Sequence, residues 1–188
     1  MTKIKVIAGS VRPGRFNIQP ATWITDIAKK HQDIEVELID LQELNLPFYD
    51  EPQTAMTGNY QHDHTKKWAK IIAEADGFIF VTPEYNHSYS PVLANAISYL
   101  NAEWNYKPVS FVSYGSLAGG ARAVEHLRGI AGELRMFDLR NQVLFPNYYF
   151  NLDDEGKYKF TDQESESAEA MITELSTWAK KLKIAREN

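Results

Sequence analysis

Short apolar runs alternate with longer amphipathic stretches from one end of the chain to the other. Two of the runs, GFIFVT and VSFVSY, are apolar throughout, as strands buried on both faces of a sheet are. The longer stretches repeat their apolar residues at helical spacing. The expected strands cover residues 3–8, 34–41, 77–82, 109–114 and 142–145. The expected helices cover residues 17–31, 65–75, 91–100, 120–136 and 164–183, and Asn17 is expected to cap the first of them. This alternation predicts an α/β fold.

Strands that alternate with helices predict a parallel sheet, because right-handed crossovers return each strand in the same direction. The expected architecture has three layers, with helices on both faces of a doubly wound, five-stranded sheet in the order 2-1-3-4-5. The chain of 188 residues is long enough for one core and short for two, so residues 1–188 are expected to form a single domain. Ligands of such sheets bind at the carboxyl ends of the strands.

Composition narrows the classes of function. The formal net charge is -5, with Lys and Arg scattered along the chain, so neither nucleic acid nor an anionic membrane is an expected partner. The absence of cysteine excludes disulfides, thiolate nucleophiles and Cys-ligated zinc. The first residues, MTKIKVIAGS, do not resemble a signal peptide, and no apolar run approaches membrane-spanning length. We therefore expect a cytoplasmic protein with a small-molecule partner.

The segment GSVRPGRFN joins the first expected strand to the first helix, where free N–H groups and the helix dipole favour an anion. It is not a Walker loop, because no Gly-Lys-Ser/Thr follows, and it is not G-x-G-x-x-G, because Val11 stands in place of the second glycine. Ser10 and Asn17 are neutral donors, and Arg12 and Arg15 are forked cations, a set that suits a terminal phosphate monoester. The alternative is that Ser10 and Asn17 only cap the turn and the helix while both arginines point into solvent.

Two further loops reach the same edge of the predicted sheet. In TPEYNHSYSP, Pro83 stiffens the turn, while Tyr85 and Asn86 offer an aromatic face and directed hydrogen bonds for a flat heteroaromatic ring. In SYGSLAGGAR, the glycines, Gly115 and Gly119 among them, let the backbone approach a ligand closely. Each loop alone is as well explained as an ordinary turn. Three such loops at one edge predict a single ligand site.

No metal site and no catalytic side chain is predicted. His62 and His64 have no carboxylate-rich frame around them, so they make a poor metal site. The polar connection 45–64 that carries them is longer than a minimal turn and is a candidate rim or lid. His87 is a candidate proton donor to an acceptor, although a histidine in a turn is more often a surface group.

The segments GSVRPGRFN, PEYN and GGARAVEHLR together resemble the NADPH-dependent FMN reductase family, which comprises flavodoxin-like quinone and azo-compound reductases. The similarity spans residues 3 to about 145. The resemblance implies that the loops bind FMN through Ser10, Arg12, Phe16 and Asn17 at the phosphate and through Pro83, Glu84, Tyr85 and Asn86 around the ring, with Ser113 nearby. Gly115 and Gly119 of the third loop are kept as further candidate cofactor contacts. Arg15 departs from the pattern, since many members have serine there. It is kept as a further candidate phosphate ligand, and the alternative is that it swings out and leaves one phosphate contact to water.

By this resemblance the protein is expected to be an FMN-dependent NAD(P)H oxidoreductase. NADPH or NADH would give hydride to FMN and leave, and a quinone, an azo compound or free flavin would then take the electrons. The protein would position the ring and stabilise negative charge with backbone amides, so no acid or base is required. Two alternatives stay open, an electron carrier, which the moderate charge argues against, and a flavin-free binder of a phosphorylated small molecule.

The resemblance also implies a homodimer or a dimer of dimers. The aromatic residues gathered around one loop, helix and loop either form an interface core or fill the chain's own core. They are Tyr85, Tyr89, Tyr99, Trp104 and Tyr106.

Overall fold

Five parallel strands form one sheet in the order β2-β1-β3-β4-β5 in the computed structural model, which describes residues 1–187. The predicted class and strand order are therefore confirmed. The strands are β1 (Thr2–Ala8), β2 (Ile34–Asp40), β3 (Gly77–Pro83), β4 (Pro108–Gly115) and β5 (Phe137–Pro146). β1 and β3 lie side by side at the centre, so the loops that follow them are neighbours.

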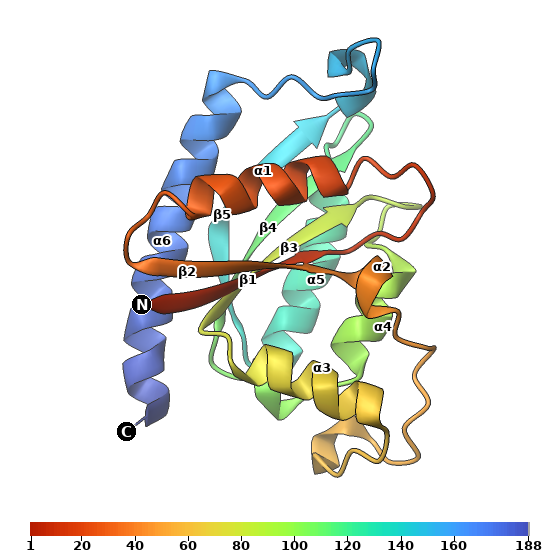
Figure 1. Ribbon diagram of the computed structural model, residues 1–188, viewed down its shortest axis with the longest axis vertical. Coiled ribbons are helices and arrows are strands. Elements are labelled where there is room, and N and C mark those ends of the chain that lie inside the picture. Colours follow the sequence, from red (N-terminus) through yellow and green to blue (C-terminus); the bar gives the residue numbers. More distant parts are fainter. Residues whose placement is uncertain (188) are drawn as a thin grey trace.

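Helices cover both faces of the sheet (Figure 1). α1 and α6 lie on one face, and α3, α4 and α5 lie on the other. The helices are α1 (Ile18–Ala28), α2 (Leu41–Leu44), α3 (Asp63–Ala73), α4 (Pro91–Ser98), α5 (Ala121–Glu133) and α6 (Asp162–Glu187), with short 3-10 turns η1 (Ala55–Thr57), η2 (Ala102–Trp104) and η3 (Tyr148–Asn151).

Neighbouring residues of each inner strand pack into different hydrophobic clusters, because successive side chains of a strand point to opposite faces of the sheet. Val6 packs into the cluster under α1 and α6, while Ile7 packs into the cluster under α3, α4 and α5. The second cluster includes Tyr99 and Trp104, whose side chains are fully buried. These two aromatics therefore fill the chain's own core, whereas Tyr106 is 53% exposed.

Three local predictions were wrong in an informative way. β5 begins at Phe137 rather than at residue 142, because exposed polar residues on this edge strand hide it from an apolar pattern. Leu41 begins α2 instead of ending a strand. Asn17 has helical angles, φ -46° and ψ -38°, and its side chain makes no capping hydrogen bond to α1.

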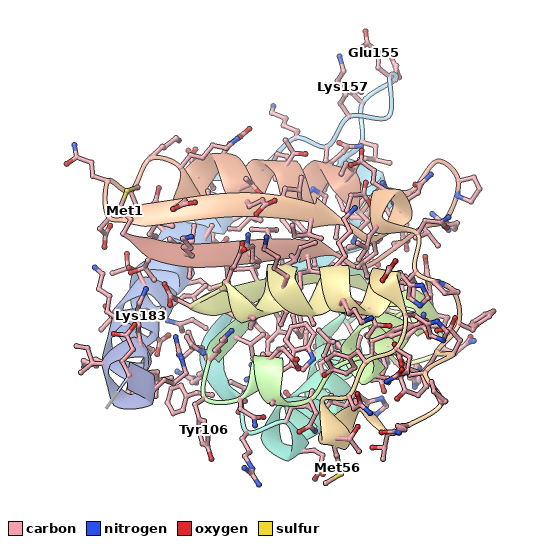
Figure 2. All side chains as sticks on the ribbon, turned by 60° about the horizontal axis from the view of Figure 1, so that its bottom comes forward. Met1, Met56, Tyr106, Glu155, Lys157 and Lys183 are labelled. Atoms are coloured by element: carbon pink, nitrogen blue, oxygen red, sulfur yellow. The ribbon has the colours of Figure 1, made fainter. Side chains whose placement is uncertain are left out.

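The end of α6 is fixed near the amino ends of the strands. Asp76, which is 4% exposed, forms ion pairs with Lys183 at 3.1 Å and with Arg186 at 3.2 Å. Figure 2 shows Lys183 on α6 and, at the far end of the molecule, Glu155 and Lys157 on the connection between β5 and α6. None of the helices within residues 1–187 combines the length and the apolar character that crossing a membrane requires.

Candidate functional site

The first loop, residues 9–17, is attached at its base to β3 and α4. The Gly9 N–H donates to the Val81 carbonyl at 2.8 Å, and the Ser90 hydroxyl donates to the Gly9 carbonyl. A Cβ atom on Gly9 would lie 2.9 Å from the Val81 oxygen, so this position accepts only glycine without movement. The start of the loop is thus fixed by the sheet itself.

A tight turn forms the middle of the first loop. The Arg15 N–H donates to the Arg12 carbonyl at 3.0 Å across Pro13 and Gly14. Gly14 has a φ of +65°, which agrees with the Pro-Gly pair of a type II turn. Beyond the turn, the Asn17 N–H has no acceptor among residues 1–187. It lies just ahead of α1, where the helix dipole favours an anion.

Polar side chains from three strand ends meet beneath this loop. The Ser10 hydroxyl lies 3.2 Å from the Tyr85 hydroxyl. The fully buried Asn17 donates through Nδ2 to the Val81 carbonyl at 3.0 Å, and its Oδ1 has no partner within residues 1–187. Burial raises the pKa of the Tyr114 hydroxyl and the nearby Tyr85 adds to the shift, while the polar side chains of Asn17 and Ser10 beside it oppose the shift. Tyr114 therefore stays protonated at neutral pH.

The two arginines of the loop point in different directions. Arg12 is exposed at the surface of the turn. Arg15 turns towards the edge of the sheet, where Nη1 donates to the Ser10 carbonyl at 2.6 Å and Nη2 pairs with Asp40 at the end of β2. Phe16 is buried, and its ring stacks in the core under α1. Arg12 is thus the cation of this loop that faces solvent.

The second loop begins with a two-residue hairpin after Pro83. The Tyr85 N–H donates to the Ser88 carbonyl at 2.8 Å, and the Ser88 N–H donates back to Tyr85 at 2.9 Å. Asn86 and His87 between them have φ values of 50° and 64°, the left-handed conformations of a type I′ turn. Residues other than glycine adopt such angles at a cost of about 1–3 kcal/mol each, and they cluster at functional sites.

The third loop packs so closely that two of its glycines leave no room for a side chain. A Cβ atom on Gly120 would lie 2.6 Å from the Ser113 Cβ, and one on Gly119 would lie 2.9 Å from the Pro146 nitrogen. Both glycines have left-handed angles, with φ of +59° at Gly119 and +91° at Gly120. The buried Ser113 hydroxyl donates to the Gly119 carbonyl at 3.0 Å. Ser113 therefore supports the loop from below.

An ion pair joins the second loop to the third. The Glu84 carboxylate accepts from Arg122 Nε at 2.6 Å and also pairs with Nη2 of the same side chain. The Glu84 N–H donates to the Tyr114 carbonyl at 3.0 Å. A Cβ atom on Gly115 would lie 3.3 Å from the Glu84 Cβ. The second and third loops consequently form one packed unit.

The connection between α2 and α3 forms a wall against α4. Asn95 donates to the Pro47 carbonyl at 2.7 Å, and the Asp50 carboxylate accepts from Tyr99 at 2.9 Å and lies 3.0 Å from His64 Nε2. Among residues 1–187 no cluster of three or more His, Cys, Asp or Glu side chains could hold a metal ion. An apolar hollow of about 410 Å³ lies beside this wall, lined by Val11, Leu46, Pro47, Phe48, Pro91, Val92 and Asn95.

Sequence reasoning missed three residues of this edge. Tyr114 could have been found from alternation along β4, because Ser113 and Tyr114 point to opposite faces and only one of them can lie under the first loop. Asp40 and Arg122 carried no such signal. They meet Arg15 and Glu84 only because the sheet brings distant segments together.

The strand order and the three loops at the carboxyl edge define a flavodoxin-like protein. The chain belongs to the NADPH-dependent FMN reductase family, whose model matches residues 2–150. An NAD(P)H-dependent FMN reductase of Schizosaccharomyces pombe is 44% identical over 136 residues, which cover 71% of this chain and 68% of that protein. An NAD(P)H:quinone oxidoreductase of Solanum tuberosum is 31% identical over 96% of this chain and 94% of its own.

A solved structure of the flavoenzyme FerB, an NAD(P)H:(acceptor) oxidoreductase from Paracoccus denitrificans, has the same fold. Its TM-score is 0.73 at 19% identity, with 96% of this chain and 98% of that chain covered. The family membership makes the protein an FMN-dependent NAD(P)H oxidoreductase, with FMN as its cofactor and NAD(P)H as its cosubstrate. The family, the fold, the enzyme class and the cofactors expected from the sequence are confirmed.

Proposed function

We propose that the three loops at the carboxyl edge form the FMN site and that the enzyme transfers hydride from NAD(P)H to a quinone. The observation that carries this proposal is the buried Asn17 Oδ1, which has no partner within residues 1–187. An unpaired buried acceptor is costly unless a ligand satisfies it. A hydroxyl of the ribityl chain, which joins the phosphate of FMN to its ring, is a donor that would do so.

The first loop fits the phosphate end of FMN. Arg12 supplies an exposed guanidinium, and the free N–H groups ahead of α1 supply further donors. Ser10 offers its hydroxyl, Phe16 offers its backbone, and Arg15 lies within the same loop. This donor set suits a phosphate monoester better than a neutral sugar.

The second and third loops fit the flat ring. The proposed ring contacts are Pro83, Glu84, Tyr85, Asn86, Ser113, Gly115 and Gly119. The close packing of Gly115 against Glu84, and of Gly119 against Pro146, fixes the backbone of these two loops. Backbone N–H groups held in this way would stabilise negative charge on the ring without reorganisation. FMN, when bound, supplies the hydride-accepting ring, so the chain needs no acid or base of its own.

We further place the enzyme in the cytoplasm as a homodimer or a dimer of dimers. Large apolar side chains that are exposed on the connections after β2, β4 and β5 are the candidate interface residues. They are Phe48 at 87% exposure, Leu117 at 83% and Phe150 at 77%. Of the five aromatics first considered for an interface, Tyr99 and Trp104 are fully buried within the chain itself.

The test compares Arg12→Ala with Arg140→Ala, a matched loss of an exposed arginine on β5. Loss of one charge-assisted phosphate contact should weaken FMN binding about 10- to 100-fold in the first variant. The rate of NADPH oxidation with benzoquinone at saturating FMN should stay close to wild type in both variants. Double-reciprocal plots of the initial rates at several benzoquinone concentrations should give parallel lines, as two separate half-reactions do. Wild-type FMN affinity in Arg12→Ala would refute the phosphate assignment, and intersecting lines would refute hydride transfer in two separate half-reactions.

A further inference from the structure

Arg15 lies inside the proposed phosphate loop, but its positive charge is already paired with a carboxylate of the protein. Its guanidinium donates to the Ser10 carbonyl at 2.6 Å and pairs with the Asp40 carboxylate. The side chains of the pair are only 11% and 10% exposed, so water screens them little. A guanidinium paired with a carboxylate has almost no net charge, so the pair attracts a nearby anion only weakly.

Asp40 is well placed to hold the loop because it belongs to two other elements. It is the last residue of β2 and pairs in register with Ala8 at the end of β1. Its second oxygen accepts from the Gln42 N–H at 2.9 Å and caps α2. The carboxylate therefore connects the first loop, the edge strand and α2.

The contact with the Ser10 carbonyl also orients the next peptide group. The C=O of Ser10 and the N–H of Val11 belong to one planar trans peptide and point in opposite directions. Because Arg15, itself paired with Asp40, holds the carbonyl on its side, the Val11 N–H points to the other side of the backbone. Loss of either partner would release this peptide and the turn that follows it.

We infer that Arg15 is a positioning residue: the Arg15–Asp40 pair holds the phosphate loop in its binding shape and leaves the charge of the FMN phosphate to Arg12 and to the backbone. This inference rests on the proposed FMN site. It assigns Arg15 a role different from direct phosphate binding, and the two roles predict opposite effects for one substitution.

That substitution is Asp40→Asn. If Arg15 bound the phosphate directly, removal of its carboxylate partner would free a cation beside a dianion and would tighten FMN binding. If the pair shapes the loop, the same change should weaken FMN binding about tenfold, as expected for loss of a charged hydrogen-bond partner. Glu43→Gln, which removes an exposed carboxylate of α2, is the matched control and should bind FMN as wild type does.

The experiment measures FMN and riboflavin binding by flavin fluorescence for wild type, Asp40→Asn, Arg15→Met, the double variant and the control. We expect both single variants to weaken FMN about tenfold and riboflavin much less, and the double variant to be no weaker than either single one, because the two residues act as one unit. An independent readout is hydrogen exchange of residues 10–16 in the flavin-free protein, which should become faster in both single variants and not in the control.

Tighter FMN binding by Asp40→Asn, or additive losses in the double variant, would overturn the inference. Unchanged hydrogen exchange in the two single variants would overturn it as well, whether or not flavin binds. Failure of the proposed FMN site itself looks different, because wild type would then show no saturable FMN binding while the exchange result still decides the role of the pair.

Discussion

Gly120 is the position in the third loop where a single added carbon should do the most damage. In Gly120→Ala the new Cβ would lie 2.6 Å from the Ser113 Cβ, 2.7 Å from its hydroxyl and 2.9 Å from the Tyr114 nitrogen. Two of these three atoms belong to the β4 backbone or are directly attached to it, so they cannot move aside cheaply. The φ of +91° adds strain, since side-chain-bearing residues rarely adopt it.

The two effects can be given a magnitude. A left-handed conformation costs a residue other than glycine about 1–2 kcal/mol, and overpacking a close-packed site costs about 1–3 kcal/mol. A loss of about 3 kcal/mol in the free energy of unfolding lies in the middle of the combined range and lowers the Tm of a chain of this size by roughly 6–12 °C. Any relief obtained by moving the loop would displace Gly119 and Ser113 and weaken FMN binding.

Gly129→Ala on α5 is the matched control, because its Cβ would meet nothing within 4 Å and its angles are helical. It should raise the stability by about 0.8–1 kcal/mol and leave FMN binding unchanged. Differential scanning fluorimetry and FMN titration of both variants carry out the test. A Gly120→Ala protein with the Tm and the FMN affinity of wild type would show that the third loop is not packed as described.

Two further substitutions test buried polar groups. Burial lowers the pKa of Lys107 to about 8, and its ammonium donates to the Ile72 and Ala73 carbonyls. The unfolded chain then binds more protons than the folded one between pH 8 and the ordinary lysine pKa, so stability should rise with pH, by about 2 kcal/mol between pH 7 and 9.5. Urea unfolding of Lys107→Met should lack this rise, and an equal rise in the variant would contradict the assignment. Tyr114→Phe removes a hydroxyl that lies beside Ser10 and Asn17 beneath the first loop, so it should weaken FMN binding about 2- to 10-fold. Because the pKa of Tyr114 is raised, this ratio to wild type should stay constant from pH 6 to 9 in a fluorescence titration, and a ratio that changes with pH in that range would count against a protonated phenol.

The fold was predictable because its signals are local. Apolar strands such as GFIFVT and helices with one apolar face are read directly from the chain, and right-handed crossovers then leave few topologies. The edge strand β5 was shortened in the prediction because its exposed residues, such as Arg140 and Asn141, carry no apolar pattern. The ends of a strand are predicted wrongly in this way wherever one face of the strand is exposed to solvent.

The candidate site was predictable in its location but not in its internal bonding. Gly9, Ser10 and Arg12 stand between a strand and a helix, which is enough to expect an anion site. The direction of Arg15 depends on Asp40, and the environment of Ser113 depends on Gly119. Such pairs form only when the sheet is assembled, so a single sequence contains no local trace of them.

The measurement that tests the central claim most directly is titration of the flavin-free protein with FMN and, in parallel, with riboflavin, followed by flavin fluorescence. The loops described above predict saturation at one FMN per chain and at least about tenfold weaker binding of riboflavin, which lacks the phosphate that the first loop holds. Equal affinity for the two flavins, or no saturable change with FMN, would contradict the assignment of this edge of the sheet as the FMN site.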